Sequence, residues 1–139
     1  MQVREGRIFI GRFPFKKDLL ISLTDFCREE GIKLGVFSVI GALTSARMGY
    51  YKQDAQEYTE CVSLDKKLEI VSCTGNISGK DSDIFVHAHI TVADHKGTCY
   101  GGHLMPGATI FAAEYCIKEL VGARLAREHD PETGLSLWK

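Results

Sequence analysis

The sequence lacks several features that would assign a function class directly. No apolar run approaches the roughly 18 residues of a membrane-spanning helix, so we expect no contact with a membrane. The net charge is −1, so there is no overall basic field to attract nucleic acid. The N-terminal stretch MQVREGRIFIGRF has neither the apolar core nor the small-residue cleavage site of a signal peptide.

Paired cysteines are also lacking. The five cysteines are an odd number and include no Cys-x-x-Cys pair, which fits neither a disulfide framework nor a zinc ribbon or finger. Most lie among apolar neighbours, where a free cysteine behaves as a small buried hydrophobe. They are Cys27, Cys61, Cys73, Cys99 and Cys116. Together with the missing signal peptide, this predicts a cytoplasmic protein.

Motifs for nucleophilic catalysis and nucleotide binding are missing as well. The sequence contains no Gly-x-Ser-x-Gly and no paired-carboxylate motif. Its glycine-rich stretch GGHLMPG is neither a P-loop nor a dinucleotide-binding fingerprint. Covalent catalysis and nucleotide chemistry therefore have little support.

The patterning that is present predicts one α+β domain over residues 1–139. Val3 to Phe13 is expected to be a strand, ended by Pro14. Lys16 to Glu30 has apolar residues at helical spacing, and Gly31 stands where a helix C-cap belongs, so this segment predicts an amphipathic helix.

From Gly35 onward the pattern changes to short β-rich runs. The block GVFSVIGALTSARMGYY predicts two strands with an interruption at Gly-Ala, and EYTECVSL and LEIVSCTGNIS are expected to form a hairpin about the turn DKK. DIFVHAHITVAD and TCYGGHLM predict a second hairpin, whereas ATIFAAEYCIKEL fits strand or helix. The tail from Gly122 is expected to be irregular. One helix with about six to eight strands indicates a mostly antiparallel sheet.

Three histidines of the second hairpin are positioned to converge. His87 and His89 are two residues apart on a strand and therefore share a face. If His95 to Gly97 form a three-residue loop, with Gly97 in the left-handed conformation, His103 lies opposite His89. A two- or four-residue loop would turn His103 to the other face, and a bulge at Gly101–Gly102 would also change the register.

Such a cluster has three interpretations: a metal site, buried structural histidines, or coincidence. Three imidazoles suit zinc first, while nickel, iron and cobalt remain alternatives. Three protein ligands would leave a fourth position for water or substrate. Gly101 and Gly102 would allow a ligand to approach closely, and Glu114 is a candidate hydrogen-bond acceptor for a metal ligand or a base acting on a bound water.

The stretch HAHITVAD…GTCYGGHLMPG closely resembles the PPC (plants and prokaryotes conserved) domain family. GRFP, GVFSVIGALTSARMGYY and LEIVSCTGNIS precede it in family order, so the resemblance covers nearly the whole chain. It implies an α+β domain that assembles as a homotrimer. It also implies that His87, His89 and His103 lie together near a subunit boundary, and that members keeping all three bind metal.

DNA binding is often attached to this family, because the plant members carry AT-hooks with an Arg-Gly-Arg-Pro core. Here REGRIFIGRF has no such core, although five of the first 17 residues are basic against one acid. The first hypothesis is thus a trimeric metal-binding domain, with zinc expected, that could be a metal-dependent hydrolase or lyase of unknown substrate. The alternative is a DNA-binding or regulatory interaction module without catalytic activity.

Overall fold

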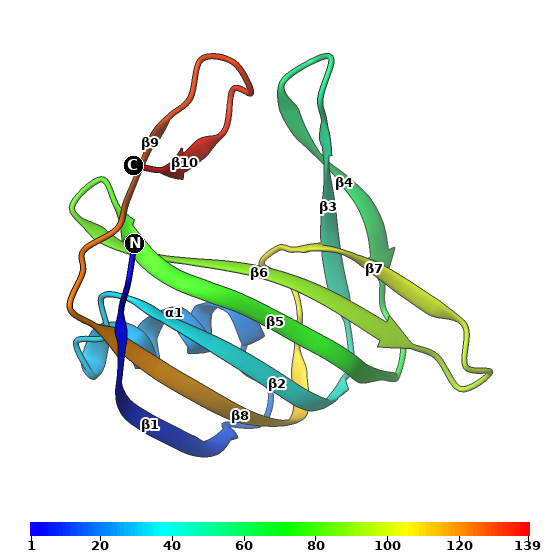
Figure 1. Ribbon diagram of the computed structural model, residues 1–139. Helices are drawn as coiled ribbons and strands as arrows, with labels where there is room; N and C mark the ends of the chain where they lie inside the picture. The colour runs from blue at the N-terminus through cyan, green and yellow to red at the C-terminus, as the bar shows by residue number, and fades with distance from the viewer.

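A ten-stranded sheet dominates the computed structural model, which describes residues 1–139 (Figure 1). The main strand order is β1-β8-β2-β5-β6-β7-β3-β4, and every pairing is antiparallel except that of β5 with β9. The predicted α+β class with one helix is confirmed. The elements are β1 (Arg4–Phe13), α1 (Leu19–Glu29), β2 (Gly35–Leu43), β3 (Ala46–Lys52), β4 (Glu57–Leu64), β5 (Leu68–Lys80), β6 (Asp83–Ala93), β7 (Cys99–Leu104), β8 (Ile110–Val121), β9 (Ala126–His129) and β10 (Ser136–Trp138).

The helix α1 is capped at both ends by local chemistry. The Asp18 side chain accepts a hydrogen bond of 3.0 Å from the Ile21 N–H, which satisfies one of the unpaired donors of the first turn. Gly31 follows the last turn with φ of 68°, the left-handed conformation that a glycine adopts without steric cost. The helix predicted between Lys16 and Glu30 is therefore confirmed, about one turn shorter at its start.

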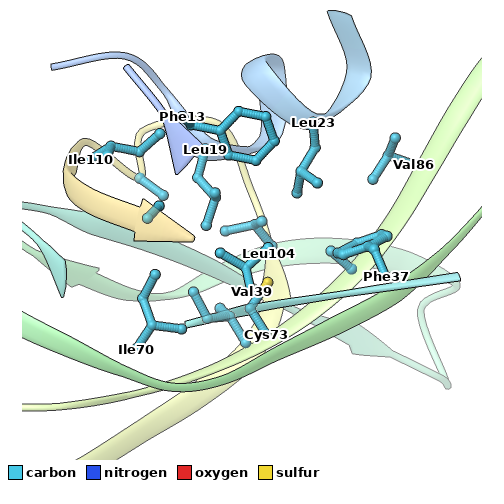
Figure 2. Packing of buried hydrophobic residues seen from close by; sticks show 14 of the residues in the cluster. Phe13, Leu19, Leu23, Phe37, Val39, Ile70, Cys73, Val86, Leu104 and Ile110 are labelled. Carbon is cyan, nitrogen blue, oxygen red and sulfur yellow. The ribbon is translucent and has the colours of Figure 1, made fainter. Parts of the chain in front are cut away.

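One face of the sheet carries the core, and α1 covers that face. The buried helix residues Leu19 and Leu23 point toward the strand residues Phe37 and Val39 (Figure 2). The core cluster comprises 23 buried residues drawn from α1 and from strands across the sheet. Because side chains alternate along a strand, the neighbours of these residues project from the opposite, outer face.

The chain itself leaves much of the outer face uncovered. Along β2, Val36 and Ile40 are exposed between buried neighbours. Direct pairing continues this face across the sheet, since Ser38 pairs with Thr74 and Thr74 with His89. The histidines of β6 therefore project from the same face as the exposed apolar residues of β2.

Two details of the predicted strands are wrong. The predicted hairpin about the turn DKK, residues 65–67, does not form, because β4 and β5 do not pair with each other. β4 pairs with β3 at the edge of the sheet, while β5 lies between β2 and β6. The break between β2 and β3 lies at Thr44–Ser45, not at Gly41–Ala42. Gly41 sits inside β2 with φ of 136°, where a Cβ would collide with the Ala112 carbonyl.

The C-terminal tail also differs from the prediction. It forms a β9–β10 hairpin, with Ser136 paired to His129, and β9 runs parallel to the end of β5. These strands have four and three residues, too few for an alternating pattern to show in the sequence. The ambiguous segment before the tail is the strand β8. No helix in the structure is long and apolar enough to cross a bilayer.

We predict that Leu23→Ala lowers the free energy of unfolding by about 2–5 kcal/mol, because it leaves a cavity between α1 and the sheet. Urea unfolding measures this change. Ile21→Ala is the matched control, since Ile21 lies on the same helix but is 52% exposed. Equal losses in the two variants would contradict the packing described for α1.

Candidate metal centre

The turn between β6 and β7 determines where the histidines lie. The Asp94 N–H donates to the Thr98 carbonyl at 3.0 Å, and the Gly97 N–H donates to the Asp94 carbonyl at 2.8 Å. Gly97 has φ of 78°, as the three-residue loop requires. His89 is consequently paired with His103, without a bulge in the β6–β7 pairing. The predicted loop and register are confirmed.

The Asp94 side chain holds this turn together. Its Oδ1 accepts hydrogen bonds from the N–H groups of Lys96 at 2.9 Å and Thr98 at 3.1 Å. Its Oδ2 forms an ion pair with Lys66 at 2.9 Å. The hydrogen bond from Lys66, followed by that from the Lys96 N–H, holds the pKa of Asp94 well below its usual value.

His87, His89 and His103 form one cluster on the outer face. Their ring centroids lie 5.0 to 5.6 Å apart, and one ligand nitrogen from each lies within 4.8 Å of the others. Nitrogens at 2.0–2.1 Å from a tetrahedral metal are about 3.4 Å apart. Modest side-chain rotations would therefore bring the three nitrogens to ligand spacing.

The cluster favours neutral imidazoles. Partial burial, then the neighbouring His103, Arg127 and His89, lower the pKa of His87 to about 4. Burial is also the main cause that lowers the pKa of His103. Neutral imidazole is the form that binds metal. His103 packs against the Tyr58 ring at 4.8 Å, and its buried Nδ1 has no hydrogen-bond partner.

Arg127 is a residue of the site that the sequence did not indicate. Its guanidinium carbon lies over the rings of Phe85 and Trp138, at 5.2 and 5.4 Å from their centroids. Its Nη2 is 3.3 Å from Nδ1 of His87. Its other side-chain partners, Asn76 and Ser78, also lie far back in the chain. No local pattern could reveal these contacts, because they depend on how the tail folds back.

A cavity of about 270 Å³ adjoins the histidines. Its walls include the β3–β4 and β9–β10 hairpins, which rise on the same side of the sheet (Figure 1). The Tyr51 hydroxyl donates to the Thr133 carbonyl at 2.6 Å and the Gln56 amide to the Glu132 carbonyl at 3.2 Å. These bonds tie the two hairpins together over the cavity.

Glu114 is not brought to the cluster. It is exposed on β8, paired with Arg12 and Ile40. The strands β2 and β5 separate β8 from β6, and three strand spacings amount to about 14 Å. Glu114 therefore lies too far away to accept a hydrogen bond from the histidines of its own chain or to act as a base beside them.

Gly101 and Gly102 line a shallow hollow beside His89. A Cβ on Gly101 would approach the Ile90 carbonyl and the Thr91 hydroxyl at 3.3 Å. A Cβ on Gly102 would lie 2.9 Å from the Gly49 carbonyl, on the side where β3 packs. The absence of a side chain at Gly102 thus allows β3 and β7 to approach closely.

The model of the Plants and Prokaryotes Conserved (PCC) domain matches residues 1–121. The chain belongs to this family. The matched region contains the three histidines and ends before β9 and β10, so Arg127 lies outside it.

Solved structures agree with this assignment. A metal-containing protein from Archaeoglobus fulgidus is 40% identical, with a TM-score of 0.93 over 99% of this chain and 96% of the other. A plant- and prokaryote-conserved protein from Pyrococcus horikoshii is 34% identical, with a TM-score of 0.93 over 99% and 94%. A candidate DNA-binding protein from Bacteroides thetaiotaomicron is 25% identical, with a TM-score of 0.87 over 99% and 96%.

Curated relatives are much longer than this chain. A protein named bifunctional protein GlmU from Synechococcus sp. strain JA-3-3Ab is 34% identical over 130 residues, which are 92% of this chain. The chain spans about a fifth of that protein's length, and of the length of a second GlmU from another Synechococcus strain. The similarity therefore concerns only a part of each.

We predict that Asp94→Asn lowers the melting temperature at pH 7, because it removes the charge that pairs with Lys66 but keeps an acceptor for the turn. A carboxylate whose pKa is depressed in the folded state stabilises the fold above its unfolded pKa and loses this effect as the pH falls below about 4. The difference from the wild type should therefore shrink below pH 4. Asp54→Asn, at an exposed turn, is the control. Identical melting of both variants at pH 7 would contradict the role assigned to Asp94.

Proposed function

We propose that this chain is a metal-binding domain that holds one divalent cation through His87, His89 and His103, with zinc as the expected ion. The observation that carries the proposal is the buried Nδ1 of His103, which lacks a partner beside two further imidazoles. An unsatisfied buried polar atom costs about 1–3 kcal/mol, so the cluster gains by acquiring a ligand. The metal-containing relative from Archaeoglobus fulgidus supports the same function.

The choice of zinc rests on the ligand chemistry. Three neutral nitrogen ligands suit zinc, while nickel, iron and cobalt accept the same ligand type. A metal held by three protein ligands keeps a position for water or another small ligand. The residues lining the adjoining cavity include no aspartate or glutamate, and Glu114 lies three strands away. We therefore propose binding of the ion and assign no reaction to the site.

The proposal includes assembly as a homotrimer. Large apolar side chains remain exposed on the outer face, among them Ile10 at 80% and Ile40 at 58%. Several large apolar side chains exposed on one face of a sheet are typical of an interaction site. A second copy covering this face would also bring the histidine cluster near a subunit boundary, as the family resemblance implies.

DNA binding is the second candidate function, favoured by the similarity to the protein from Bacteroides thetaiotaomicron. The basic residues of β1 are its candidate contacts, but Arg7 already pairs with Glu119 at 2.8 Å and with Glu30 at 3.4 Å. If DNA is bound through phosphates, the affinity for duplex DNA must fall steeply with salt. Fluorescence anisotropy at two salt concentrations tests this alternative.

A location in the cytoplasm is also proposed. All five cysteines are free thiols, and Cys27 and Cys73 are buried in the core. Burial raises the pKa of each of these two thiols to about 12, which keeps them protonated and unreactive. Free thiols in this number fit a reducing compartment.

We predict that untagged protein carries about one metal ion per chain and that His87→Ala/His89→Ala reduces this at least about tenfold, since two of three ligands are lost. Elemental analysis after incubation with zinc gives the stoichiometry. His95→Ala/His129→Ala is the matched control, because both residues are exposed and lie outside the cluster. Metal that is absent from the wild type, or retained by the first variant, would overturn the metal-binding function.

We predict a mass in solution near three times the 15.4 kDa of one chain, measured by light scattering. Ile40→Asp should dissociate the trimer, because it buries a charge in the interface without a partner. Ile21→Asp, on the exposed side of α1, should leave the mass unchanged. A monomeric wild type, or a trimer insensitive to Ile40→Asp, would contradict the proposed interface.

A further inference from the structure

The charged side chains around the histidine cluster are all positive. The cavity beside it is lined by twelve residues, of which Lys80 and Arg127 are cationic and none is acidic. Arg127 approaches one histidine closely, with Nη2 at 3.3 Å from Nδ1 of His87. A divalent cation bound by the histidines would add two positive charges beside this guanidinium. The chain supplies no carboxylate there to balance them, and such an excess is costly where water is partly excluded.

Arg127 keeps hydrogen-bonding capacity toward the cavity. Three of its N–H groups donate to protein oxygens, namely Ser78 Oγ, the Ser136 carbonyl and Asn76 Oδ1. A guanidinium has five N–H groups, so two remain; the one on Nη2 lies against Nδ1 of His87, and the one on Nη1 is left free. Contacts with the rings of Phe85 and Trp138 help to hold the guanidinium in place. A fixed guanidinium with a free donor is well suited to an anionic oxygen.

Lys80 is a second cation at the cavity. Its ammonium lies 5.2 Å from the centroid of the Phe85 ring and forms no ion pair. Lys80 therefore raises the positive potential of the cavity without being neutralised by the chain.

The remaining walls and the size limit the ligand. The rings of Tyr58 and Phe85 and the side chain of Leu137 provide apolar surface. A volume of about 270 Å³ corresponds to roughly nine water molecules at about 30 Å³ each. The cavity thus has room for a molecule of about nine non-hydrogen atoms with an apolar body and one charged end.

We propose that this cavity binds a small organic carboxylate, whose charged group lies beside Arg127 and Lys80 next to the histidine cluster and whose apolar body lies against Tyr58 and Leu137. The inference rests on the proposed function, because the bound cation supplies part of the attraction. The C-terminal hairpin, which carries Arg127 and Leu137, then acts as the element that determines which ligand fits.

Benzoate is a suitable probe, and benzamide is its uncharged counterpart of the same size. Calorimetry measures the binding of each to zinc-loaded and to chelator-treated protein, and the fluorescence of Trp138, the one tryptophan, gives a second readout. We expect zinc-loaded protein to bind benzoate at least about tenfold more tightly than benzamide, and chelation to weaken benzoate binding by a similar factor.

Lys80→Met tests the contribution of charge without disturbing a hydrogen bond. It should weaken benzoate about fivefold and leave benzamide unchanged. Lys96→Met, at the exposed tip of the β6–β7 loop, should change neither. Arg127→Lys keeps the charge but removes the planar fork, and we expect a larger loss of benzoate affinity than for Lys80→Met.

The metal content of the same samples separates the two proposals. Zinc-loaded protein that binds benzoate no better than benzamide, or that binds neither at millimolar concentration, overturns the carboxylate site and leaves the metal-binding function standing. Protein that takes up no zinc yet binds benzoate in a Lys80-dependent way overturns the metal-binding function and supports the anion preference of the cavity. Benzoate binding that is unaffected by Lys80→Met and Arg127→Lys overturns the proposed position of the ligand.

Discussion

The register of the β6–β7 hairpin is the constraint on which the site depends. The period of side chains along a strand is two, so a slip of one residue would turn His103 toward the core and separate it from His89. Gly97 in its left-handed conformation and the Asp94 side chain, bound to two N–H groups of the turn, stabilise the observed register. A short polar loop at the far end of the hairpin thereby determines whether three imidazoles can meet.

The two faces of the sheet differ in what they carry. The inner face is packed under α1 and contributes most of a core of 23 residues, so strand positions are held by apolar packing. The outer face carries the histidines, the exposed apolar residues and Glu114. Because core packing does not determine the side chains there, that face can carry the histidine cluster and the exposed apolar residues.

The surroundings of the histidine cluster hold its imidazoles in the neutral form, which is the form that binds cations. Partial burial, followed by the neighbouring His103 and the Arg127 guanidinium, disfavours imidazolium, so His87 stays uncharged at neutral pH and keeps one nitrogen with a lone pair for a cation. The same arrangement leaves the Nδ1 of His103 without a partner and places Arg127 where no acid balances it. The proposed cation and carboxylate would supply the missing hydrogen-bond partner and the missing negative charge.

The amino-acid sequence by itself determined the elements whose pattern is local. Periodicity predicted the helix, alternation predicted that His87 and His89 share a face, and Gly97 favoured the three-residue loop that places His103 opposite His89. Only the tertiary structure decided that β4 pairs with β3 and not with β5, and that Glu114 lies far from the cluster. It also decided that the tail folds into a hairpin that brings Arg127 to His87. Arg127 contacts residues 40 to 51 positions earlier in the chain. Contacts of this kind depend on strand order and on chain segments packing over one another, and neither leaves a periodic signal in the residues concerned.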